Sequence, residues 1–248
     1  MNKENEKYSR DLFKSLEKYD SEFTDTIYNF SQVEVQKVCK LSDKDKFLCN
    51  LSVLIGCQSL SMVANVLDVA LKKNVDVIAI KEMLYQATAY LGIGRTYDYL
   101  IKTNEIMLKN EVTLPLESQT TTNETNRFEK GLDKQVALFG KQMLDNQTKA
   151  PKIRKNINRW LASNCFGDYY TRTGLNDKER EMITFCFILA QGGCENQLRG
   201  HTAGNFNVGN GKEKLYQIIE QCVPYIGYPR SLNAMNIVDE ISLQYENK

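Results

Sequence analysis

Four polar side chains in the second half of the chain share a spacing that could support chemistry: Cys194, Gln197, His201 and Asn205. Steps of three, four and four residues place all of them on one face of a helix over 194–208. His201 is the only histidine among 248 residues. An imidazole that titrates near neutrality is suited to move a proton to or from a substrate carbon. The spacing therefore predicts a polar site centred on His201.

Three charged side chains outside this stripe are further candidates. Glu181 lies near the start of the preceding apolar helix, where it could meet the imidazole. Arg172 and Arg199 could bind a substrate carboxylate, because a guanidinium matches the geometry of that group. The alternatives are structural. A lone histidine is commonly a hydrogen-bonded framework residue, a single Cys194 cannot run a dithiol cycle alone, and either arginine could be a solvated surface residue.

Composition limits the class of protein. The formal net charge is +1, which gives no electrostatic reason to expect a nucleic-acid partner. The first ten residues carry charges throughout, and the longest apolar run, 182–190, is far too short for a membrane span. We therefore expect a cytoplasmic protein without a membrane partner. Seven cysteines contain no C-x-x-C pair, so no local zinc or dithiol motif is encoded, and we predict neither a metal nor a cofactor.

The elements that position these residues are predicted to be helices, because apolar residues recur at helical spacing and only four prolines interrupt them. The segment 41–57 aligns with 175–191 at an offset of 134, and QATAYLGIGR (86–95) aligns with QCVPYIGYPR (221–230) at an offset of 135. We therefore predict a tandem duplication. Its parts are a first repeat over 1–112, a polar linker over 113–126 and a second repeat over 127–248. Each aligned segment begins with a helix cap, at Ser42 or Asn176.

Four ordered motifs in the second half carry a family resemblance: RFEKGL (127–132), FGDYYTRTGLNDKERE (166–181), NQLRGHTAGNFNVGN (196–210) and QCVPYIGYP (221–229). They resemble the carboxymuconolactone decarboxylase family. The first half resembles it more weakly, through LSDKDKFL, ALKKNVD and QATAYLGIG. The chain is thus similar to fused, two-repeat members of the alkylhydroperoxidase D-like superfamily. This resemblance implies an all-α fold in which the two repeats form a pseudo-dimer. Because single-repeat members form rings of six subunits, we predict a homotrimer.

The resemblance also implies a choice of chemistry. The peroxidase branch uses a C-x-x-C followed by a histidine, and here the second cysteine falls at Gln197. The decarboxylase branch has Glu-Leu-x-x-His, which this chain keeps as Leu198 and His201, with Gln197 replacing the acid. We therefore predict a cofactor-independent decarboxylase that acts on a small carboxylated lactone of the 4-carboxymuconolactone type. His201 would donate the proton, Arg172 or Arg199 would bind a carboxylate, and Gln197 would stabilise a dienolate.

Two other functions stay open. One is a thiol-dependent peroxidase or oxidoreductase centred on Cys194, and the other is a non-catalytic ring protein that binds a small acidic ligand. In the first repeat, Val66 occupies the position that matches His201. We therefore expect that repeat to be a structural partner, which could line the site through residues such as Gln58 or Tyr85.

Overall fold

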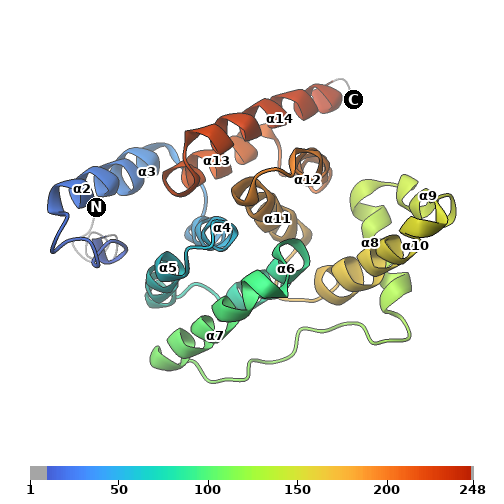
Figure 1. The fold of residues 1–248 in the computed structure, drawn as a ribbon, viewed down its shortest axis with the longest axis horizontal. Coiled ribbons are helices and arrows are strands. Elements are labelled where there is room, and N and C mark those ends of the chain that lie inside the picture. The colour runs from blue at the N-terminus through green and yellow to red at the C-terminus, as the bar shows by residue number, and fades with distance from the viewer. Residues whose placement is uncertain (1–9, 247–248) are drawn as a thin grey trace.

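The computed structural model describes residues 10–246, and this part of the chain folds into helices without a β-strand (Figure 1). The all-α prediction is confirmed. In chain order the elements are α2 (Ser21–Tyr28), η1 (Asn29–Glu34), α3 (Val35–Val38), α4 (Asp43–Gly56), α5 (Leu60–Lys72), α6 (Val77–Leu91), α7 (Ile93–Lys109), α8 (Arg127–Phe139), α9 (Gln142–Thr148), η2 (Lys152–Arg154), α10 (Lys155–Trp160), η3 (Leu161–Tyr170), α11 (Asp177–Gln191), α12 (Glu195–Asn207), α13 (Lys212–Ile226) and α14 (Tyr228–Glu246). Both η1 and η3 are π-helical, and η2 is a turn of 3-10 helix. Within residues 10–246, no helix has the length and apolar character needed to cross a membrane.

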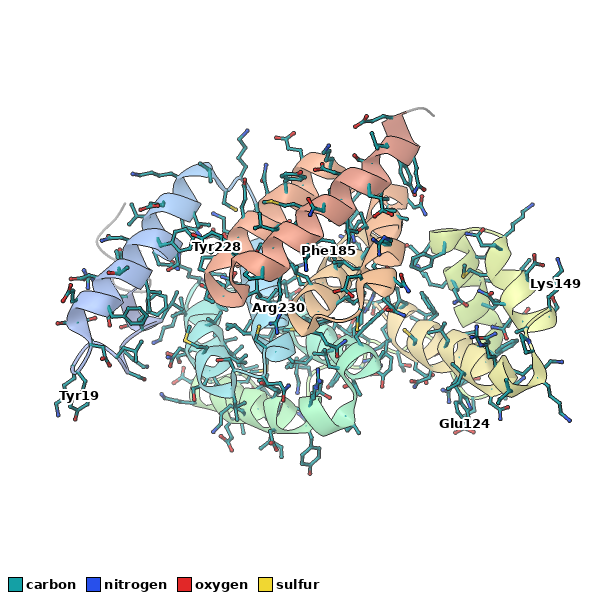
Figure 2. The ribbon with its side chains drawn as sticks, turned by 45° about the horizontal axis from the view of Figure 1, so that its top comes forward. Tyr19, Glu124, Lys149, Phe185, Tyr228 and Arg230 are labelled. Atoms are coloured by element: carbon teal, nitrogen blue, oxygen red, sulfur yellow. The ribbon has the colours of Figure 1, made fainter. Side chains whose placement is uncertain are left out.

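Two central helices, α4 and α11, pack against each other in the core. All residues over 48–56 and over 180–190 are buried, as expected for helices that neighbours cover on every side. The two helices approach closely at Gly56, where an added Cβ would lie 2.7 Å from the Cβ of Ala190. Figure 2 shows Phe185 of α11 at the centre of the molecule, with Tyr19 and Lys149 at opposite ends.

The start of each central helix is capped as predicted. The Ser42 hydroxyl accepts a hydrogen bond from the backbone amide of Asp45, at 3.1 Å. The Asn176 side chain accepts from the amide of Glu179, and the Glu179 carboxylate accepts from the amide of Asn176 in return. This capping box satisfies two amides that the helix itself cannot pair.

The order of elements is similar in both halves. In the first half, η1 and the short α3 precede four helices, α4 to α7, and in the second half η3 precedes four helices, α11 to α14. Between the halves, residues 113–126 form a largely extended connection that runs from α7 to α8 (Figure 1). The duplication and its boundaries remain predictions, which this order of elements supports.

The second half also carries a lobe formed by α8, α9 and α10, which stands at one side of the molecule (Figure 1). In this lobe α8 packs along η3. Two glycines permit the contact: an added Cβ at Gly131 would clash with the carbonyl oxygen of Ala162, and one at Gly167 would clash with that of Arg127. The close packing makes α8 and η3 a continuous wall beside α12.

Candidate active site

His201 lines a cavity of about 430 Å³ that lies between α6, α8, α9, η3, α11 and α12. The walls are mainly apolar. The apolar lining residues are Ala89, Phe139, Met143, Leu161, Phe166 and Ile188. The polar or sulfur-containing ones are Tyr90, Gln135, Cys165, Gln191, Cys194, Gln197 and His201. An apolar cavity with a few polar groups is the usual form of a small-molecule site.

A buried carboxylate orients the imidazole of His201. The Nδ1 atom lies 2.9 Å from Oε2 of Glu181, whose side chain is fully buried. The other ring nitrogen, Nε2, has no hydrogen-bond partner within residues 10–246. Since the carboxylate occupies one nitrogen, it fixes the ring and leaves the second nitrogen for a ligand in the cavity.

Helix α12 is built to admit this carboxylate. An added Cβ at Gly204 would lie 2.3 Å from Oε2 of Glu181, so only glycine leaves space for the acid there. Asn205 is buried, and its amide donates to the backbone carbonyl oxygens of Glu181 and His201, at 3.0 and 2.8 Å. Asn205 therefore ties α12 to α11 behind the imidazole, and it does not line the cavity.

Both halves of the chain contribute to the hydrogen bonds around Glu181. The hydroxyl of Tyr170 donates to Oε1 of Glu181, at 2.8 Å, and lies 2.9 Å from the hydroxyl of Tyr90 on α6. The Tyr170 hydroxyl also lies 2.8 Å from Oγ1 of Thr184, which accepts from Nε2 of Gln86. Burial raises the pKa of Tyr90 and that of Tyr170 well above the usual range, so both phenols are neutral donors.

Two aromatic rings hold the imidazole edge-on. The ring centroid of His201 lies 5.3 Å from that of Tyr90 and 5.4 Å from that of Phe139, with interplanar angles of 80° and 88°. Edge-to-face contacts of this kind are a favoured arrangement of aromatic rings. The first half thus supplies one of the two rings that position the histidine.

The two thiols in the cavity have different surroundings. The sulfur of Cys194 accepts a hydrogen bond from Nε2 of Gln191, at 3.2 Å, and Oε1 of Gln191 accepts from Arg95 of the first half, at 2.9 Å. The thiol of Cys165 lies 3.7 Å from the hydroxyl of Tyr90 and is buried. Burial raises the pKa of Cys165 to about 12, which keeps that thiol protonated at neutral pH.

The predicted site residues are only partly brought together. Glu181, Cys194, Gln197 and His201 meet at or beside the cavity. The two predicted arginines do not line it. Arg199 forms a surface ion pair with Glu240, at 3.0 Å. Arg172 is bound to Glu82 in a different cavity, which Tyr85 also lines, because the loop after η3 turns that arginine toward α6.

Sequence reasoning missed two contributors to the cavity. Tyr90 lies in the aligned block 86–95, so the repeat alignment contained the signal that would have found it. Gln135 on α8 is 4% exposed, and its Oε1 has no hydrogen-bond partner among residues 10–246. Buried amide oxygens are normally paired, so this one is available to accept a hydrogen bond from a ligand in the cavity. Within residues 10–246, no group of three His, Cys, Asp or Glu side chains is placed to hold a metal ion.

Comparison with known proteins matches this part of the chain. The sequence model of the carboxymuconolactone decarboxylase family matches residues 156–240, a range that includes Glu181, Cys194 and His201. The 4-carboxymuconolactone decarboxylase of Acinetobacter baylyi is 27% identical over 120 residues, which are 48% of this chain and 89% of that protein. The four motifs, the helical fold and both matches agree, and the second half of the chain is similar to the carboxymuconolactone decarboxylase family.

Proposed function

We propose that the cavity catalyses the cofactor-independent decarboxylation of a small carboxylated lactone of the 4-carboxymuconolactone type. One observation carries the proposal: Glu181 holds Nδ1 of the only histidine, while Nε2 is free to act in a mainly apolar cavity. This is the arrangement that a proton donor to carbon requires. The matched decarboxylase supplies the substrate class.

In the proposed reaction, the bond between the lactone carbon and its carboxylate breaks and carbon dioxide leaves. The electron pair of that bond moves into the ring as a dienolate, with its charge on the lactone carbonyl oxygen. The protonated imidazole of His201 then gives its Nε2 proton to a ring carbon, and the lactone is restored. The buried Glu181 carboxylate forms an ion pair with the imidazolium before the transfer and keeps the ring oriented afterwards.

The walls of the cavity suit both stages of this reaction. Apolar side chains such as Phe139, Phe166 and Ile188 replace water around the departing carboxylate, which favours its loss as neutral carbon dioxide. Gln135 also lines the cavity, and its Nε2 would be the atom that donates to the lactone or its second carboxylate. At the rim, the exposed Gln197 offers a donor to the dienolate oxygen.

A second candidate function is thiol-dependent peroxide reduction at Cys194. The observation that favours it is the hydrogen bond that the Cys194 sulfur accepts from Gln191, backed by Arg95. In this reaction the thiolate attacks one peroxide oxygen, and a sulfenic acid and water form. An external thiol must then reduce the sulfenic acid, because the other cavity thiol, Cys165, is held protonated.

A paired assay separates the two functions. Wild type, His201→Gln and Cys194→Ser would each be tested for loss of 4-carboxymuconolactone by ultraviolet absorbance and for peroxide consumption with a thiol reductant. The proposal expects lactone turnover that survives in Cys194→Ser and is lost in His201→Gln. Peroxide consumption that disappears with Cys194, together with no lactone turnover by wild type, would replace it with the thiol chemistry. Binding of the lactone without either turnover would indicate a ligand-binding protein.

We also propose a homotrimer, on the basis of the family resemblance. Large apolar side chains are exposed on the lobe, including Ile153, Ile157 and Trp160, and contacts between copies would cover such surfaces. Light scattering after size-exclusion chromatography should give three times the chain mass of 28.5 kDa. A mass of one chain would contradict this assembly and leave the proposed chemistry unaffected.

A further inference from the structure

A second cavity, of about 200 Å³, lies nearer the start of α6 than the histidine cavity. Its walls come from α6, the linker and the loop that follows η3, and they include Lys81, Glu82, Tyr85 and Arg172. The linker is fastened over the cavity, because the carbonyl oxygen of Gln119 accepts from the backbone amide of Thr173, at 2.9 Å.

The groups in and behind the wall of this cavity carry more buried positive charge than negative charge. Arg172 and Arg180 both bind Glu82: Arg172 with two nitrogens at 2.9 and 3.0 Å, and Arg180 with one at 3.2 Å. One carboxylate is therefore shared between two guanidinium groups, of which that of Arg180 is fully buried. Burial lowers the pKa of Arg180, which shows the electrostatic cost of this arrangement.

Lys81 adds a third cation without a counter-charge of its own. Its side chain is buried, and within residues 10–246 no carboxylate oxygen lies within 4 Å of its Nζ. The Nζ binds the neutral Oδ1 of Asn104, and burial lowers its pKa. Lys81 and Arg172 both face the ring of Tyr85, at 5.5 and 5.3 Å from its centroid. Two cations therefore flank one aromatic ring at the wall of an open cavity.

We propose that this cavity is a binding site for a small oxyanion, a carboxylate or a phosphate, which Lys81 and Arg172 would hold together. A buried cation without a counter-charge is costly, and an anion beside it removes that cost. The volume suits a group of this size and excludes a nucleotide or a peptide. Glu117, the one other carboxylate in the lining, is exposed, so water screens its charge.

The site is connected to the active-site histidine by hydrogen bonds. From Glu82 the path runs through Arg180 to Oε1 of Gln86, at 2.7 Å, and from Gln86 to Thr184. From Thr184 it continues through Tyr170 and Glu181 to Nδ1 of His201. An anion that competes with Glu82 for Arg172 should therefore change the environment of the imidazole.

Calorimetric titration with inorganic phosphate, and separately with malonate, tests the site at constant ionic strength. The proposal expects saturable binding of at least one anion to wild type, at least a tenfold loss of affinity in Lys81→Met, and unchanged binding in the exposed control Lys149→Met. Arg172→Gln provides a second variant if Lys81→Met does not fold. No binding to wild type, or equal binding to Lys81→Met, would overturn the site.

The coupling has its own measurement, because a single histidine gives a single imidazole resonance. The ¹H–¹³C NMR signal of the His201 ring should move as the anion is added to wild type and stay in place in Lys81→Met. Binding that leaves the resonance of wild type unmoved would overturn the coupling and leave the site. Since neither measurement requires turnover, failure here is separate from failure of the proposed decarboxylation.

Discussion

Under the predicted duplication, the His201 cavity corresponds to a cavity in the first half that has different chemistry. At the offset of 134 or 135 that relates the aligned segments, Val66 corresponds to His201, Phe47 to Glu181 and Gln36 to Tyr170. These first-half residues line a smaller cavity of about 200 Å³. In both places a glutamine from the opposite half crosses the interface, Gln86 in one and Gln221 in the other.

The hydrogen bonds show what the difference means. In the first-half cavity, amides bind amides: Gln36 donates to Gln221 at 3.0 Å, and Gln221 donates to Asn50 at 3.1 Å. Amides do not titrate, so this network can only hold the two halves together. The second-half network ends in a carboxylate and an imidazole, which can exchange a proton. A similar order of helices thus has a structural role in the first half and carries the proposed chemistry in the second.

The largest expected effect comes from removing the imidazole. His201→Gln should lower kcat for lactone turnover about 100- to 10,000-fold, the usual range for a lost general acid. Lys46→Gln, in the first-half cavity, is the matched control and should leave kcat unchanged. Steady-state kinetics of both variants check this. Equal losses in the two variants would mean that the cavities do not differ in function.

The next effect concerns the carboxylate that the first half lacks. Glu181→Gln keeps the shape of the side chain and removes its charge, so it should lower kcat about 10- to 100-fold with little change in KM. Circular dichroism would show whether the helical content is kept. A variant that folds normally and turns over at the rate of wild type would contradict the orienting role of Glu181.

A smaller effect is expected for Gln135, which lies on the lobe that the first half does not have. Gln135→Leu removes an unpaired buried amide, so the free energy of unfolding should not fall. If the amide binds the substrate, KM should rise about tenfold, the effect of one hydrogen bond to a charged group. Thermal unfolding and KM are to be measured on the same preparation, and an unchanged KM would remove Gln135 from the substrate contacts.

Much of this arrangement could be predicted from the sequence. Helical periodicity and capping residues located the central helices, and the three- and four-residue steps placed Cys194 and His201 at one cavity. Periodicity fixes the faces of a helix, but it does not determine which helices meet. The bond between Arg172 and Glu82 and the position of Gln135 depend on contacts between distant segments, such as the glycine-mediated packing of α8 on η3, and these were therefore missed.

Tyr90 and Tyr225 occupy aligned positions in the two halves, so the same substitution at each of them compares the two cavities directly. Tyr90→Phe removes a hydroxyl that binds Tyr170, so it should lower kcat about threefold and the free energy of unfolding by about 1 kcal/mol. Tyr225 is its aligned counterpart, and its hydroxyl contacts Asn50, at 3.5 Å, and Gln32, neither of which is bonded to the histidine network. Tyr225→Phe should therefore leave kcat unchanged. A larger loss of turnover in Tyr225→Phe than in Tyr90→Phe would reverse the assignment of the two cavities.

The smallest effect is a predicted lack of reaction at Cys165. With a pKa of about 12, only about one Cys165 in 10,000 is a thiolate at pH 8, so iodoacetamide should leave it unmodified. Labelling should increase as the pH rises toward 12, because the thiolate fraction grows about tenfold with each pH unit. Peptide mass spectrometry measures the extent of labelling of Cys165 and compares it with that of Cys194, which lines the same cavity. Rapid labelling of Cys165 at pH 8 would mean that a second reactive thiol faces Cys194, and the peroxidase alternative would then gain the partner it lacks.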